Sequence, residues 1–226
     1  MSDEAIAAQP ERGRFDATDR RALRAVALQF FVNGALFASV MPRLPEIRDR
    51  VEVSITTIGV LLSLAGLSGL VGSAVVGSAI ARFGTRTVII FSATMMALSV
   101  ALVGVARAPG LLLVGLIGLS TFDVLVDVGM NMQGSWLSAR RHAPVMNRLH
   151  GLWSLGTLIG GLTSARVAAA GVSLSTHLVV AAAVLALVVV QVGRGVLRID
   201  EAPSAAAGTP AISTPGPGRR RAWPRP

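Results

Sequence analysis

Uncharged apolar runs alternate with short charged segments along most of the chain. Five runs, each bounded by arginine or glutamate, cover residues 25–42, 53–81, 87–106, 149–165 and 167–193. A sixth, 109–132, is interrupted only by Asp123 and Asp127. Each approaches the roughly 20 residues that a helix needs to cross a bilayer, where only helices and closed barrels satisfy the backbone. The pattern predicts an all-α polytopic membrane protein with six transmembrane helices.

The composition supports a membrane protein. The 226 residues are 52% hydrophobic and only 15% charged, whereas soluble domains carry about 25% charged residues. The absence of cysteine excludes disulfides, thiolate metal sites and cysteine nucleophiles. The net charge of +9 comes from 21 arginines that lie between the apolar runs and near the chain ends. We attribute this charge to membrane topology and expect no nucleic-acid partner.

The arginines also predict an orientation and three segments. With a cytoplasmic N-terminus, 16 of the 21 arginines lie in inner segments, and five lie in outer ones: Arg43, Arg48, Arg50, Arg107 and Arg166. The positive-inside rule then places both termini in the cytoplasm. We expect a cytoplasmic segment over 1–22, the six-helix bundle over 23–200, and a disordered Pro- and Arg-rich cytoplasmic tail over 201–226.

The apolar runs 53–81 and 149–165, the second and fifth in chain order, share a pattern of small residues. SLAGLSGLVGS (63–73) and SLGTLIGGLTS (154–164) are identical at five of eleven positions without gaps. Equivalent helices of two inverted three-helix repeats, as in many secondary transporters, would match in this way. Membrane helices rich in glycine, serine and leucine also match by composition alone. In both cases the small residues allow close helix packing.

GSAIARFGTRT (77–87) resembles the loop between helices two and three of the major facilitator superfamily (MFS). Gly77, Arg82, Gly84 and Arg86 match its pattern, and Ala81 stands at the usual acidic position. In the family that acid helps to latch the two halves together, so its replacement by Ala81 argues against latching by this loop. Three further segments resemble helices one, four and five of bacterial fucose-permease-like members: 30–50, 127–134 and 149–156.

The resemblance covers about residues 20 to 200 and implies the N-terminal six-helix half of a twelve-helix fold. It implies a secondary transporter of a small polar solute, such as a sugar or related metabolite, in a bacterial inner membrane. Protons are a possible coupling ion, and membrane lipids are the surroundings. The half would act as a homodimer or with a complementary six-helix half. The alternative is a truncated, non-transporting half or scaffold, with a tail that reads like a frameshift product.

Asp123 and Asp127 are the sharpest candidates for chemistry. An ionised carboxyl at mid-membrane costs about 2.5–3.5 kcal/mol on insertion scales, so such residues usually face a bundle interior or water. Their i, i+4 spacing puts both on one helix face, which Asn131 continues. Asp123 would exchange a proton or bind a solute hydroxyl, or else be a hydrogen-bonded structural residue.

Asp127 is expected nearer the cytoplasm, in a state-dependent charge network. Its cation would be Arg82 or Arg86, or else the Arg148–His150 end of the fifth helix; direct solute contact is the alternative. His150 would act in gating at the inner surface. Asn33, a polar amide inside the first helix, would contact solute or make a helix–helix hydrogen bond.

The sequence argues against an enzyme. An intramembrane serine protease suits six helices, but Ser154 lies near the inner end of the fifth helix and His177 near the outer end of the sixth. Their depths differ by about 15–20 Å at 1.5 Å per residue. That exceeds the reach of a nucleophile–base hydrogen bond. No phosphate-binding loop, dinucleotide fingerprint or metal cluster occurs, so we expect no cofactor and no metal.

Overall fold

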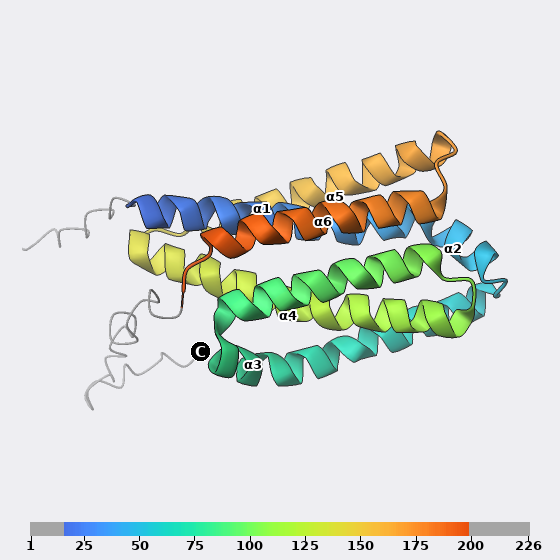
Figure 1. Ribbon diagram of the computed structural model, residues 1–226, viewed down its shortest axis with the longest axis horizontal. Coiled ribbons are helices and arrows are strands. Elements are labelled where there is room, and N and C mark those ends of the chain that lie inside the picture. Colours follow the sequence, from blue (N-terminus) through green and yellow to red (C-terminus); the bar gives the residue numbers. More distant parts are fainter. Residues whose placement is uncertain (1–15, 199–226) are drawn as a thin grey trace, which may run out of the picture.

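The structure, a computed structural model, describes residues 16–198 (Figure 1). The predictions for residues 1–15 and for the tail over 201–226 lie outside this range. Within it, the chain forms one 3₁₀ turn and six α-helices: α1 (Ala17–Val40), η1 (Met41–Arg43), α2 (Leu44–Arg50), α3 (Ile55–Val105), α4 (Pro109–Arg141), α5 (Met146–Ala169) and α6 (Leu174–Gly195). The described residues contain no strand, which confirms the all-α class.

Side-chain caps fix where three of the long helices begin. The carboxylate of Asp16 accepts a hydrogen bond from the backbone N–H of Asp19 at 2.7 Å. Ser54 and Ser173 cap α3 and α6 in the same way, through the N–H groups three residues later. Pro109 opens α4, where its missing N–H costs nothing. These starts place the connecting turns at the two ends of the bundle.

Helix α3 contains two of the six predicted spans. At Gly84 the backbone takes φ 76° and ψ 156°, a conformation that essentially only glycine adopts. The chain reverses there, and segments 55–83 and 85–105 run in opposite directions (Figure 1). The bundle therefore consists of six long rods, with the short α2 at one end.

Length and hydropathy agree with a membrane bundle. Four helical stretches in the described range are long and apolar enough to cross a membrane, and α3, counted once, reverses within its length. Helix α5, with 24 residues, does not reach the same hydropathy. Large apolar side chains also cover the outside, including Leu98, Val184 and Leu187. Such a surface suits lipid, since soluble monomers rarely expose wide apolar patches.

The helices pack in two reciprocal sets. Helix α1 lies against α5 and α6, and α3 lies against α4 and α6. Segment 55–83 contacts α4 through small residues. A Cβ atom at Gly72 would lie 2.8 Å from the carbonyl oxygen of Thr121, and the Thr121 hydroxyl lies 3.1 Å from the Ser68 hydroxyl.

Helix α5 contacts α1 in the corresponding way. Cβ atoms at Gly156 and Gly160 would collide with the backbone carbonyls of Phe31 and Ala35. The Ser164 hydroxyl donates to the carbonyl of Ser39 at 2.7 Å. The second helix of each three-helix unit thus packs on the first helix of the other unit, as two inverted repeats require. The predicted repeat is confirmed.

A buried glutamine joins the end of α6 to α4. The Nε2 of Gln133 donates to the Thr85 hydroxyl at 2.7 Å and to the carbonyl of Leu197 at 2.9 Å. Its Oε1 accepts from the N–H of Leu197, also at 2.9 Å. One side chain therefore ties the chain leaving α6 to the residue that follows the reversal at Gly84.

Candidate functional site

A hydrogen bond between the first helices of the two repeats marks the centre of the site. The Nδ2 of Asn33 on α1 donates to Oδ1 of Asp123 on α4 at 3.0 Å. Asn33 is 3% exposed, and Asp123, near the midpoint of α4, is half-buried. The interhelical contact expected as one alternative for Asn33 is present, and its partner is the carboxylate selected for proton or solute chemistry.

Gln29 belongs to the same site and is absent from the sequence predictions. It lies one helical turn before Asn33 on α1 and is 1% exposed. Among the described residues, neither of its amide atoms has a hydrogen-bond partner, and Oδ1 of Asn33 also lacks one. Buried polar groups left unpaired cost about 1–3 kcal/mol each, so these atoms favour a polar ligand beside them. The i, i+4 spacing of Gln29 and Asn33 in an uncharged run was the available signal.

Asp127 and Asn131 continue the polar face toward the α4–α5 end. The Nδ2 of Asn131 donates to Oδ1 of Asp127 at 3.0 Å and to its carbonyl at 2.8 Å. Asp127 itself is exposed. Neither of the two expected arginines, Arg82 and Arg86, forms an ion pair with it within residues 16–198.

The imidazole of His150 lies within electrostatic reach of Asp127. It lies in the second turn of α5, where its ring edge meets the Phe30 ring at 5.3 Å between centroids. Of the alternatives offered by the sequence, the geometry therefore favours the His150 end of α5 over the arginines. Asp123 also lies within electrostatic reach of Asp127, so two carboxylates share this face.

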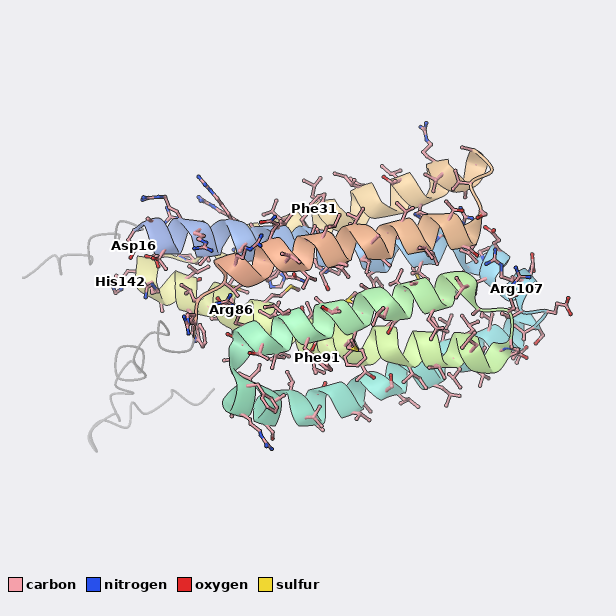
Figure 2. The ribbon with its side chains drawn as sticks, in the orientation of Figure 1. Asp16, Phe31, Arg86, Phe91, Arg107 and His142 are labelled. Atoms are coloured by element: carbon pink, nitrogen blue, oxygen red, sulfur yellow. The ribbon has the colours of Figure 1, made fainter. Side chains whose placement is uncertain are left out.

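The residues of the glycine–arginine loop have different surroundings. Gly84 makes the reversal, whereas Gly77 lies in regular helix with nothing near the place of a Cβ atom. The Arg82 guanidinium lies over the ring of Phe83, 5.3 Å from its centroid. Arg86 lies at the same end of the bundle as Asp16 and His142, and Arg107 lies at the opposite end (Figure 2).

The end of the bundle that contains Arg107 is closed by an arginine that sequence reasoning did not select. Arg43 is 2% exposed, forms a 2.6 Å ion pair with Glu46 and donates to the carbonyl of Val172 at 2.8 Å. Glu46 also accepts from the N–H of Leu174 at 3.3 Å. These bonds tie η1 and α2 to the α5–α6 turn, so this end of α1 is held in place.

The geometry offers no catalytic pair at Ser154 and His177. Ser154 donates to the carbonyl of His150 near the start of α5. His177 lies near the start of α6, at the opposite end of the bundle, beside Arg43 and Glu46. Within residues 16–198, no group of three His, Asp or Glu side chains is arranged to hold a metal ion.

Comparisons with known proteins identify the family. The model of the Major Facilitator Superfamily matches residues 26–222. An uncharacterized MFS-type transporter from Yersinia pestis is 26% identical over 133 residues, which cover 59% of this chain and 35% of the relative. An uncharacterized transporter from Sinorhizobium fredii is 30% identical over 137 residues, 61% of this chain and 36% of the relative.

Two further likenesses agree. The membrane protein MosC from Rhizobium meliloti is 28% identical over 141 residues, 62% of this chain and 35% of MosC. The crystal structure of the nucleoside transporter NupG matches with a TM-score of 0.64 at 14% identity, covering 80% of this chain and 44% of NupG. At that identity the likeness shows the fold alone. The matched part of this chain spans about a third of the length of its curated relatives.

Proposed function

Because this chain belongs to the Major Facilitator Superfamily, whose model matches residues 26–222, we propose that it moves a small polar solute across a membrane by alternating access. The chain is a multi-pass membrane protein of a transporter family, and its relatives indicate transport rather than catalysis. The resemblance to this superfamily is confirmed; the closer resemblance to fucose permeases stays a prediction.

The observation that carries the proposal is the amide–carboxylate pair of Asn33 and Asp123, with the Gln29 amide one turn away. Asn33 and Asp123 meet between the first helices of the two repeats, and Gln29 is buried one turn earlier on α1. Secondary transporters bind solute near the bilayer midplane at such a repeat interface. Amides and a carboxylate suit hydroxyl-rich solutes, such as sugars or nucleosides.

We assign the residues different roles in this cycle. Asp123 takes up a proton, or accepts a hydrogen bond from a solute hydroxyl, in place of the hydrogen bond that Asn33 donates. Asp127, held by Asn131, pairs with His150 in one access state and releases it in the other. We assign gating to the reversal at Gly84 and to its neighbours Gly77, Arg82 and Arg86; Arg86 lies at the end of the bundle that contains Asp16 and His142.

The arginines support a placement in a bacterial inner membrane with the chain ends in the cytoplasm. In the described range, five arginines lie at the Arg107 end: Arg43, Arg48, Arg50, Arg107 and Arg166. Ten lie at the other end: Arg20, Arg21, Arg24, Arg82, Arg86, Arg140, Arg141, Arg148, Arg194 and Arg198. The positive-inside rule assigns the richer end to the cytoplasm.

We also propose that a second six-helix bundle covers the polar face, supplied by another copy or by a complementary half. Asp127 is exposed on α4, and His150 is exposed on α5. Exposed carboxylates of spanning helices are costly against lipid and are normally turned toward protein or water. The other candidate, a half that inserts but moves no solute, follows if the face has no partner.

Reconstitution separates these two candidates. Proteoliposomes loaded with a pH dye are given sugars and nucleosides in turn, and a solute that acidifies the lumen identifies proton-coupled uptake. Labelled-solute uptake without a pH change identifies facilitated transport. Crosslinking in membranes through a cysteine introduced at Asn147, beside His150, reports the partner. A monomer with no flux for any solute would favour the non-transporting half.

A further inference from the structure

An apolar pocket lies beside the reversal at Gly84, between the two segments of α3 that meet there. It has a volume of about 330 Å³. Ala79 and Phe83 line it from segment 55–83, Phe91 lines it from segment 85–105, and Leu125 lines it from α4. Apart from the Thr87 hydroxyl, the walls that the pocket presents are apolar, so it offers a polar solute almost no hydrogen-bond partner.

The ring of Phe91 separates this pocket from a second groove on the same segment. That ring meets the Phe122 ring of α4 edge to face, at 6.0 Å between centroids, which fixes its position. The second groove has a volume of about 390 Å³, and Arg86, Ile90 and Thr94 line it. At 100° per residue, these three lie on one side of Phe91 around the helix, whereas the pocket lies on the other side. Two grooves therefore flank one aromatic ring, and Thr87 lines both.

Two arginines lie where both grooves approach the reversal. Arg86 lines the second groove, and the Arg82 guanidinium lies over the ring of Phe83, which lines the pocket. No acidic residue occurs in the sequence between Glu52 and Asp123. None of the ion pairs within residues 16–198 includes either arginine. This end of the grooves therefore favours an anionic group.

The grooves change from basic to apolar along segment 85–105. In Figure 2, Phe91 lies further than Arg86 from the end of the bundle that contains His142. At 1.5 Å per residue, Phe91 lies about 7.5 Å beyond Arg86 along the axis, and Met95 lies about 13.5 Å beyond it. Half of the hydrocarbon core of a bilayer is about 15 Å thick. A phospholipid has the same order and the same reach, with a phosphate at the surface and two acyl chains beneath it.

We propose that an anionic phospholipid occupies this site, with its phosphate at Arg82 and Arg86 and one acyl chain on each side of Phe91. Guanidinium groups bind phosphate through paired charge-assisted hydrogen bonds. Apolar cavities of about 150 Å³ already stay dry and bind apolar molecules, and an empty pocket forfeits dispersion contacts. In a bilayer the abundant apolar molecule is the acyl chain. The inference needs only that segments 55–83 and 85–105 span a membrane, so it and the transport proposal can fail separately.

Filling the pocket tests where the lipid lies. The full chain in a neutral detergent is titrated with phosphatidylglycerol, and the retained lipid is counted by native mass spectrometry. Ala79→Leu adds side-chain volume inside the pocket and should weaken retention about tenfold. The control Ala81→Leu makes the same change at an exposed position outside the lining, and it should alter retention less than about twofold. Equal retention in the two variants would overturn the proposal.

A second pair of variants tests the charge at the headgroup. Arg86→Gln should weaken the retention of phosphatidylglycerol about fivefold and reduce its preference over phosphatidylcholine of the same acyl chains. Arg148→Gln removes a charge from α5, outside both grooves, and should change retention less than about twofold. Equal losses in these two variants, or equal retention of both lipids by the original chain, would contradict an anionic phospholipid.

Two further measurements guard against misfolding and against another occupant. Bound phosphatidylglycerol should raise the midpoint of thermal unfolding of the original chain but not that of Ala79→Leu, because a ligand that binds only the folded state stabilises it. If Ala79→Leu does not fold, Ala79→Met replaces it with the same expectation, since a flexible side chain fills irregular gaps. A crosslinked dimer that Ala79→Leu abolishes, with lipid retention unchanged, would assign the pocket to a second bundle and overturn the proposal.

Discussion

Asn33 donates a hydrogen bond to Asp123 at 3.0 Å across a sequence separation of 90 residues, and so joins the first helices of the two repeats. This contact pairs a costly mid-membrane carboxylate with a buried amide. The same pair stabilises the bundle and supplies the proposed transport chemistry. Its stabilising part and its functional part can be measured separately.

A double-mutant cycle measures the stabilising part. Asn33→Ala, Asp123→Ala and the double variant are unfolded reversibly in mixed micelles, with helix content as the signal. We expect a coupling free energy of about 0.6–1.7 kcal/mol, between the average and the largest value found for hydrogen bonds between membrane helices. A coupling of zero would mean that the two side chains do not interact in the membrane.

Gly160 tests the packing of α5 on α1. A Cβ atom there would collide with the backbone of Ala35, which cannot rotate away. Gly160→Ala should destabilise the bundle by about 1–3 kcal/mol, as overpacking does elsewhere. Gly151 lies on the same helix with nothing near the place of a Cβ atom, so Gly151→Ala should be neutral or slightly stabilising. Equal thermal stability of the two variants would refute the close contact.

Gly77 and Gly84 should respond differently to alanine. Gly84 adopts a glycine-only conformation, so Gly84→Ala should cost about 1–3 kcal/mol in stability. Gly77 is helical and open, and Gly77→Ala should leave thermal unfolding unchanged or raise its midpoint. If Gly84→Ala is tolerated as well as Gly77→Ala, the reversal does not depend on this residue.

Gln133 tests the connection between α4 and the end of α6. Gln133→Leu would leave the N–H and carbonyl of Leu197 unpaired, and it should cost about 2–3 kcal/mol in the free energy of unfolding. Thr85→Val removes one of the three hydrogen bonds and should cost about 1 kcal/mol. Thr87→Val, at an exposed neighbouring position, is the matched control. Proteolysis rates after residue 197 should rise in the same order.

The sequence predicted the features that follow from hydropathy and from repeated small residues. The six spans, the inverted repeat and the location of Asp123 in the fourth helix are of this kind. The reversal at Gly84 was also accessible, because charged residues interrupt the apolar pattern there. Each of these depends on local composition, which a bilayer constrains strongly.

The partners of the polar residues could not be predicted in the same way. Gln29 is an ordinary amide in sequence, and only the packing of α1 leaves it buried without a partner. The closeness of His150 rather than Arg82 to Asp127 depends on how α5 lies along α1. The closure by Arg43 likewise depends on packing, because it joins Arg43 to the carbonyl of Val172, 129 residues away in the sequence.

Solute-driven proton flux in proteoliposomes containing Asp123→Asn tests the transport proposal most directly. The variant keeps the shape of the side chain but holds no exchangeable carboxyl proton. Uptake coupled to protons should fall at least tenfold, while membrane insertion and helix content stay unchanged. Asp49→Asn, at an exposed carboxylate outside the site, should transport like the original chain. Undiminished flux in Asp123→Asn would contradict the role assigned to Asp123.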